Sequence, residues 1–207
     1  MEKSSFFNSV SGDRKYKAED WASYFASFIG NGVFPLPSTG LQVVAGNGMQ
    51  VTVKAGKAWI NGYFYNNTSD LSLTLATADG VLNRIDRVVV RWDLTNRLIS
   101  VKVKSSSPSA SPAAPNIERD ADIYELALAD IYIGAGVTSI TGSKITDKRL
   151  DTSVCGVVAA VVDQIDTEAF NAQLEAWFTE YQSNSAAEYN SLVSYMNSLK
   201  LQGNTQY

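Results

Sequence analysis

Residues 83–104 constrain the fold of this chain more than any other stretch. The first half of this stretch, residues 85–92, is rich in β-branched and aromatic residues, and residues 98–103 alternate apolar and polar side chains. The sequence DLTNR at residues 93–97 is typical of a turn in which Asn96 adopts a positive φ angle. The whole stretch therefore predicts a β-hairpin.

Three consecutive valines, Val88–Val90, stand in the middle of the first strand of this hairpin. A strand with one face in water alternates apolar and polar residues, whereas a strand covered on both faces is apolar without interruption. We therefore expect this strand to lie inside a sheet and not at its edge.

Short strand-like segments separated by turn residues surround the hairpin. The strongest turn signal is Asn61–Gly62, which predicts a second hairpin between residues 57–60 and 63–66. Residues 123–133 favour a strand with a kink near Ala129–Asp130. Because these strands are short and closely spaced, they favour an antiparallel β-sandwich or small barrel over a parallel sheet.

We assign this β-rich domain to residues 33–153, and the fold class is α+β once the flanking helices are included. Residues 105–116 inside the domain, SSSPSASPAAPN, are low in complexity. Their prolines cannot donate a hydrogen bond to a strand ladder. The sequence therefore predicts a flexible or exposed loop at this point of the domain.

Residues 1–32 are expected to form an extended arm followed by a short helix over Ala18–Ile29. Aromatic residues recur in this helix at helical spacing, namely Trp21, Phe25 and Phe28. A helix of this length is not stable alone, so its aromatic face must pack on a sheet or on a partner. The arm contains Phe6 and Phe7, which can cover either their own domain or a neighbouring subunit.

Residues 154–207 are expected to form a C-terminal helical region that oligomerises or docks another protein. The apolar segment Val154–Val162 either packs as a strand or begins the helix. Beyond it, large apolar residues keep the alternating three-and-four spacing of a helical seam. These residues are Phe170, Leu174, Trp177, Tyr181, Leu192, Tyr195 and Leu199. Ser185 and Glu188 match a capping box between the two halves of the seam, so one long rod (a coiled coil) and a helical hairpin both stay open.

Composition excludes several classes of function. The chain has 207 residues, a formal net charge of −4 and no histidine. It therefore lacks the basic face that nucleic acids require and the commonest general base and metal ligand. No apolar run approaches the ~20 residues of a membrane span. The one cysteine, Cys155, lies in an apolar run without an activating neighbour, so we expect no catalytic site, no metal and no cofactor.

The best candidates for a pair of catalytic carboxylates are four aspartates near strands: Asp86, Asp93, Asp130 and Asp147. They have no orienting partner residues in the sequence, and acids at strand ends are far more often structural. For the charged residues of the central hairpin we expect an ion-pair ladder across the sheet. These residues are Asp86, Arg87, Arg91 and Asp93.

Aromatic residues make up 11% of the chain, and such residues are enriched in protein interfaces as well as in cores. Trp59, Tyr63 and Tyr65, in the sequence AWINGYFYN, are also suited to stacking on sugars. They suggest an alternative function as a carbohydrate-binding module that recognises a host receptor. Because these aromatic residues occur on both faces of short strands, we favour an interface.

Five sequences occur in this order along the chain: FNSVSGDRKYKAEDWASYFASFIGNGVFP, GMQVTVKAGKAWINGYFYNN, NRIDRVVVRWD, YELALADIYI and ITDKRL. Together they resemble the N-terminal attachment module of tail-fibre and baseplate (receptor-binding) proteins. The proteins with this module come from phages and prophages of low-GC Gram-positive bacteria. The resemblance covers about residues 6 to 165 and depends on the order of the motifs, because no single motif is decisive.

The resemblance implies a non-enzymatic structural protein of the virion, made in the host cytoplasm. Such a module fixes a tail fibre or receptor-binding protein to the tail tip, as part of a homotrimer, and contacts other baseplate or tail-fibre proteins. No distal receptor-binding domain is recognisable before Tyr207, which favours a short adaptor or a truncated chain over direct host attachment. The expected interfaces are the aromatic residues of the arm and first helix, and the C-terminal helical seam.

Overall fold

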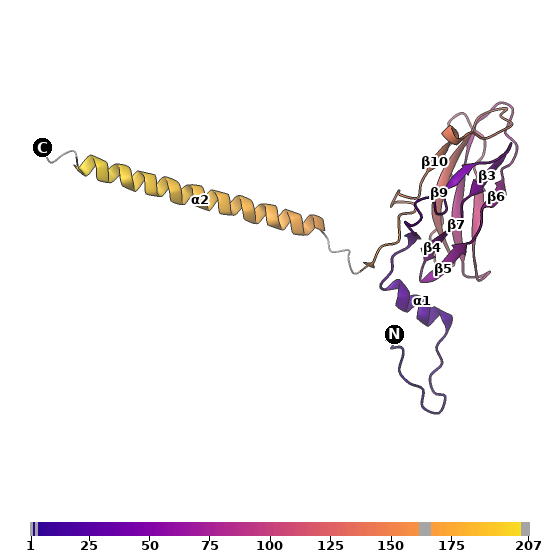
Figure 1. Cartoon of the computed structure of the whole chain (residues 1–207), viewed down its shortest axis with the longest axis horizontal. Helices are drawn as coiled ribbons and strands as arrows, with labels where there is room; N and C mark the ends of the chain where they lie inside the picture. Colours follow the sequence, from indigo (N-terminus) through magenta and orange to yellow (C-terminus); the bar gives the residue numbers. More distant parts are fainter. Residues whose placement is uncertain (1, 3, 162–166, 204–207) are drawn as a thin grey trace. The chain divides into compact units, whose positions relative to one another are not determined.

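The structure is a computed structural model. It describes the backbone of residues 2, 4–161 and 167–203, and their side chains except in 167–174 and 197–203. The chain divides into two compact units, Met1–Asp163 and Gln164–Tyr207. Within the described residues, the first unit contains a short helix, the strands β1 to β10 and a 3-10 turn at Gly142–Lys144, and the second contains one long helix (Figure 1).

The predicted hairpin lies inside a four-stranded antiparallel sheet. The order of its strands is β10 (Ile145–Asp147), β9 (Ile123–Ile133), β7 (Arg84–Asp93) and β8 (Leu98–Ser105). Val88, Val89 and Val90 of β7 are fully buried, because β7 is paired on both edges and covered on both faces. The prediction of a central strand is confirmed.

The turn between β7 and β8 differs in one detail from its predicted form. The carboxylate of Asp93 accepts hydrogen bonds of 2.8 Å from the backbone N–H and from the side-chain amide of Asn96. The positive φ angle, 52°, belongs to Arg97 and not to Asn96. Because both hydrogen bonds fix Asn96 against Asp93, the residue with the positive φ angle lies one position later than predicted.

The predicted kink in β9 is a β-bulge. Val88 pairs with Ala129 and Val89 with Ala127, so Leu128 has no partner on β7. The carbonyl of Leu128 instead accepts a hydrogen bond of 2.9 Å from the N–H of Lys148. The irregularity therefore lies one residue before the predicted position.

Two three-stranded antiparallel sheets pack on the core face of the four-stranded sheet. One has the order β1 (Gly32–Val33), β4 (Gly56–Ile60), β5 (Tyr63–Asn67), and the other the order β2 (Val43–Ala45), β3 (Gln50–Val53), β6 (Leu71–Thr74). All three sheets contribute to one hydrophobic core, which includes Val51, Ile60, Val90 and Leu126. The predicted α+β class with antiparallel sheets is confirmed.

The two lateral edges of this arrangement differ. At one edge β2 contacts β10. There Arg149 pairs with Asp147 at 2.6 Å and donates hydrogen bonds to the carbonyl groups of Ser38 and Gly40 at 2.9 and 2.7 Å. At the other edge, β5 and the start of β8 border an open cleft. One edge is therefore bridged by hydrogen bonds and an ion pair, whereas the other borders a cleft.

Ion pairs cover the outer face of β7 and β9. Arg87 makes a bidentate pair with Asp130 at 2.6 and 2.8 Å. The fully buried carboxylate of Glu125 accepts hydrogen bonds of 2.8 Å from Arg91 and from Lys104. The expected ladder therefore forms with different partners, because acids of β9 and not those of the hairpin face the two arginines.

The Ser/Pro/Ala segment lies against this charged face. Arg87 donates to the carbonyl of Pro115 at 2.9 Å, and Lys104 donates to that of Asn116 at 2.8 Å. Two residues further on, the N–H of Glu118 donates to Glu125 at 2.8 Å. The segment is a loop, as predicted, but it is partly buried and held by the sheet. The reason is that a segment outside any strand still has free carbonyl groups, which can accept hydrogen bonds from cationic side chains fixed on the sheet.

A second ion pair ties β7 to the chain that precedes it. Arg84 and Asp86 are both buried, with 3.1 Å between the Arg84 Nε atom and the carboxylate. The same guanidinium donates to the carbonyl groups of Ala76 and Thr77. Burial raises the pKa of Asp86, and the charge and hydrogen bonds of Arg84 oppose that rise. This pair fixes the chain after β6 against the central sheet.

The helix α1 (Ala18–Ala26) rests on the Asn61–Gly62 turn. The two turn residues have φ angles of 51° and 83°, as the predicted hairpin type requires. A Cβ atom on Gly62 would overlap the carbonyl oxygen of Ala22, so the helix backbone touches the turn directly. The helix ends at Ala26 and is therefore three residues shorter than the predicted Ala18–Ile29.

Residues 157–160 lie beside β1 and the end of α1, where Val157 forms an isolated β-bridge with Val33 and Ala160 forms one with Ile29. Val158 donates a hydrogen bond of 2.9 Å to Val33, and Val161 donates one of 2.8 Å to the carbonyl of Phe28. Of the two alternatives for this segment, the structure shows a strand-like one and not the start of the C-terminal helix.

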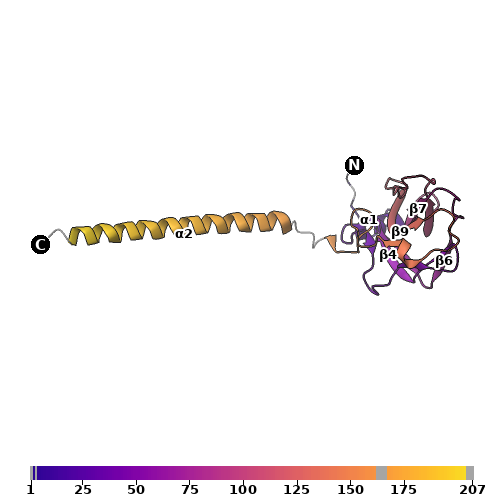
Figure 2. The same cartoon turned by 90° about the horizontal axis from the view of Figure 1, so that it is seen from above.

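The second unit contains one uninterrupted helix, α2 (Thr167–Gly203), of 37 residues (Figure 2). Its length is about 55 Å. Ser185 and Glu188 lie inside this helix and start no new one, because a capping box acts only where a chain enters a helix. The helical-hairpin alternative is therefore wrong.

We expect Gly62→Ala to destabilise the first unit by about 2–4 kcal/mol, because the methyl group overlaps the Ala22 carbonyl and the φ angle is left-handed. Thermal unfolding of the full-length variant measures this loss. Gly136→Ala is the matched control, because Gly136 has a φ of 67° but nothing within 4 Å of the added atom. It should cost about 1 kcal/mol. Equal losses would show that α1 does not depend on the turn.

Glu125→Gln should cost about 3 kcal/mol, because it removes a buried carboxylate that faces Arg91 and Lys104. Glu118→Gln is the matched control, because Glu118 contacts the same two cations but its side chain is 45% exposed, whereas that of Glu125 is 0% exposed. Its cost should stay below about 1 kcal/mol. Denaturant unfolding at neutral pH measures both losses in the free energy of unfolding. Equal losses for the two variants would show that burial of the Glu125 carboxylate does not determine its contribution.

Candidate functional site

Aromatic side chains of the arm and of α1 form one exposed cluster, which we call the aromatic cap. The Phe6 ring lies 4.4 Å from the ring of Trp21 and 4.8 Å from that of Tyr24, between centroids. The cluster continues along α1 through neighbouring rings. Its members are Phe6, Trp21, Tyr24, Phe25 and Phe28. Four of the five predicted interface residues of this region therefore lie in one cluster, which Tyr24 extends.

The aromatic residues of α1 do not form its buried face. Ala22 is the buried residue of the helix, and it faces the Asn61–Gly62 turn. Four aromatic side chains of the cap come from α1 and the residues just after it. Each of them is 40–48% exposed. Phe25 alone reaches the sheet, where its ring stands perpendicular to that of Trp59 at 6.1 Å. The cap is thus attached to the domain but left uncovered.

The arm folds back on its own helix. The Tyr16 hydroxyl accepts a hydrogen bond of 2.8 Å from the N–H of Phe7 and donates one of 3.0 Å to its carbonyl. The Phe7 ring is 59% exposed and lies under the guanidinium of Arg14 at 5.2 Å. In the single chain, Phe6 therefore covers its own domain, while Phe7 stays outside the cap.

The described side chains of α2, in residues 175–196, are all exposed. Trp177 and Tyr181 stack with 5.8 Å between ring centroids, and each is 59% exposed. Leu192 follows Tyr181 by eleven residues, which is three helical turns to within about 20°. The two halves of the predicted seam, including Tyr195, therefore share one face of the helix across its polar middle.

Four further large apolar side chains of α2 are exposed beside this seam and were not among the predicted seam residues. They are Phe178, Tyr189, Val193 and Met196. Three of these residues recur at intervals of four and three, so their spacing could have revealed them. The predicted seam residues Phe170, Leu174 and Leu199 lie in the helical backbone, but their side chains fall outside the described residues.

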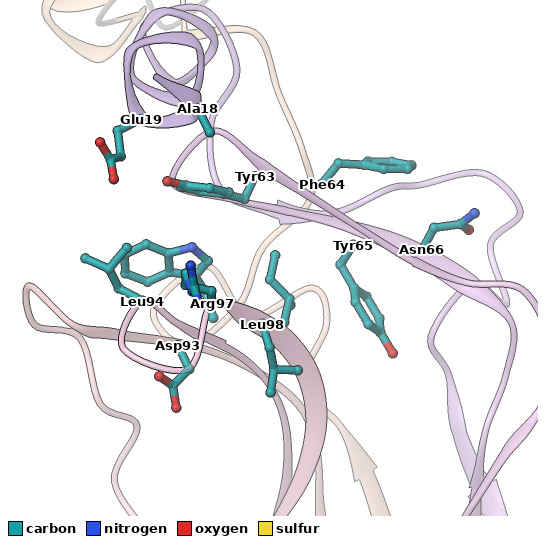
Figure 3. A pocket seen from close by; sticks show the side chains of 12 residues that line it. Ala18, Glu19, Tyr63, Phe64, Tyr65, Asn66, Asp93, Leu94, Arg97 and Leu98 are labelled. Atoms are coloured by element: carbon teal, nitrogen blue, oxygen red, sulfur yellow. The ribbon is translucent and has the colours of Figure 1, made fainter. Parts of the chain in front are cut away.

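The three aromatic residues predicted as sugar contacts do not share a surface. Tyr63 and Tyr65 line a cleft of about 510 Å³ between β5 and the β7–β8 turn (Figure 3). Trp59 of β4 lies on the opposite face, under Phe25, because neighbouring strand positions point to opposite faces of a sheet. Trp92 takes its place in the cleft, with its ring 5.5 Å from that of Tyr63.

The candidate catalytic groups are engaged elsewhere in the fold. Asp130 pairs with Arg87 and Asp147 with Arg149, and burial raises the pKa of Cys155 to about 12. Among the residues that the structure describes, no three His, Cys, Asp or Glu side chains are placed to hold a metal ion. No helix in the described ranges combines the length and the apolar character of a membrane span.

No family model, curated protein or solved structure matches this chain.

We expect Phe6→Ala to release the arm from α1, because Phe6 supplies its contacts with Trp21 and Tyr24. Trypsin should then cleave after Arg14 and Lys15 several times faster than in the wild type. Limited proteolysis followed by mass spectrometry measures the rate. Val10→Ala is the matched control, because Val10 is 72% exposed, and it should change the rate little. Equal rates in wild type and Phe6→Ala would show that Phe6 does not hold the arm.

Proposed function

We propose that this chain is a non-enzymatic structural protein of a phage tail tip or baseplate. In this role it is an adaptor or attachment subunit that joins a tail fibre or receptor-binding protein to the tail. The observation that carries the proposal is the presence of two aromatic surfaces, one in each unit, that no other described part of the chain covers. The order of the sequence motifs, which resembles that of phage tail proteins, is the reason for assigning these surfaces to a virion protein.

The aromatic cap has the composition of a protein interface. Tryptophan and tyrosine are enriched among the residues that dominate binding energy, and exposed clusters of apolar side chains mark interaction sites. Trp21 and Tyr24 are held by neighbouring rings on a helix that the Asn61–Gly62 turn positions. A partner that covers the cap therefore gains apolar burial without having to order the surface first.

The helix α2 has the properties of an oligomerisation element. Only five of its 37 residues are charged, which is few for a helix surrounded by water. A lone helix gains little from intrinsic propensity, and most helical stability comes from packing of an apolar face. We therefore assign α2 to a homotrimer, in which copies of this chain bury the seam between them.

Together the two surfaces explain an adaptor that works by binding and not by chemistry. The cap would contact a neighbouring baseplate protein, and the α2 trimer would set the symmetry and offer a rod on which a fibre can continue. The β-rich unit would be the rigid body that carries the cap.

Sedimentation equilibrium of the full-length chain tests the assembly. We expect a trimer for the wild type and a monomer for the double variant Tyr181→Ser, Leu192→Ser, because both seam residues are exposed in the single chain. Asn190→Ala is the matched control, because residue 190 lies on the opposite face of α2, nine residues or about 180° from Tyr181. A monomeric wild type, or a double variant that stays trimeric, would refute assembly through this seam.

A further inference from the structure

The open lateral edge of the first unit contains a cleft that the proposed function does not use. Its volume is about 510 Å³, within the range of small-molecule sites. The walls come from β5, from the β7–β8 turn and from the first turn of α1 (Figure 3). Since α1 and both strands belong to one unit, the cleft is formed within a single chain.

The floor of the cleft is aromatic and preformed. The rings of Tyr63 and Trp92 lie 5.5 Å apart at an angle of 43°, and Tyr65 lines the same cleft. Trp92 belongs to the hydrophobic core, and the two tyrosines pack against it. Because Trp92 is only 7% exposed, the ring surface open to a ligand is that of the two half-buried tyrosines, whose position the core sets.

Polar groups without partners surround this floor. Glu19 and Arg97 line the cleft from α1 and from the β7–β8 turn. Neither side chain makes an ion pair or a hydrogen bond with any other residue that the structure describes, and the same is true of Asn66. The Glu19 carboxylate lies on the same side of the cleft as the Tyr63 hydroxyl (Figure 3), and burial together with this charge raises the pKa of Tyr63. By contrast, Asp93 is engaged by Asn96.

We infer that this cleft binds a saccharide. A sugar ring has an apolar face, which suits the rings of Tyr63 and Tyr65, and hydroxyl groups that both donate and accept hydrogen bonds. Such hydroxyls can donate to the Glu19 carboxylate and accept from the Arg97 guanidinium, while the Asn66 amide can do both. The inference goes beyond the adaptor function and does not depend on trimer formation.

An extended peptide is the competing occupant. Four consecutive residues of β5, 63–66, line the cleft, so the free edge of that strand borders it and could pair with another strand. A peptide bound in this way would use main-chain groups and would leave the Glu19 and Arg97 side chains without partners. The unpartnered charged groups on opposite walls therefore favour the saccharide.

Ligand-observed NMR titration of the full-length protein tests the inference, with maltotriose, globotriose and chitotriose as the probes. We expect at least one trisaccharide to bind, and Glu19→Gln and Arg97→Ala each to weaken its binding about tenfold, because the first replaces a charged acceptor with a neutral one and the second removes a charged donor. Both residues are exposed, so these variants should keep the fold. Lys102→Ala and Glu180→Gln are the matched controls, because neither residue lines the cleft, and they should leave binding unchanged.

Absence of binding for all three trisaccharides up to about 20 mM would overturn the inference. Equal binding by the wild type, Glu19→Gln and Arg97→Ala would overturn it as well. A capped peptide of alternating threonine and valine that binds where the sugars do not would assign the cleft to strand addition instead. Sedimentation of the same variants separates this result from the adaptor proposal, because none of these substitutions lies in the α2 seam.

Discussion

The outer layer of the β-rich unit depends on one buried carboxylate, that of Glu125. It accepts hydrogen bonds from Arg91, from Lys104 and from the backbone of Glu118. Burying a charge is costly unless its hydrogen bonds are complete, and here two cations and an amide complete them. Lys104, one of these cations, and the neighbouring Arg87 also donate hydrogen bonds to carbonyl groups of the proline-rich loop. One face of β7 thus packs in an apolar core and the other lies under a salt-bridged loop, which explains the unbroken run of valines.

The parts of the fold that sequence reasoning predicted are those with a local cause. The Asn61–Gly62 turn needs two residues with positive φ, and the valines of β7 report the burial of their own strand. The anchoring of the loop at 105–116 to the sheet escaped prediction, because its anchors are backbone carbonyls, which every residue has, and the donors lie 28 and 12 residues away. The bulge at Leu128 is likewise compensated by a distant residue, Lys148.

The candidate surfaces show the same division between local and distant causes. Helical spacing located the aromatic residues of α1 correctly, yet it did not reveal which face is buried. The burial of Ala22 is set by Gly62, which is forty residues away and has no side chain to signal the contact. In the same way, spacing grouped Trp59 with Tyr63, although the hairpin register pairs Trp59 with Phe64 and so places it on the face opposite to Tyr63. Trp92, which shares the cleft with Tyr63, belongs to another hairpin.

Two glycines explain how the first unit supports an exposed aromatic cap. Side chains at Gly62 and Gly32 would collide with the backbone of Ala22 and of residues 156–158, so backbone contacts hold the middle of α1 and the chain that follows the helix. The aromatic rings are therefore not needed to fix the helix and stay available for a partner. No such anchor exists for α2 within the residues described, since its described side chains are exposed. Under the proposed function, the cap is preformed before assembly, whereas α2 is stabilised by the packing that assembly provides.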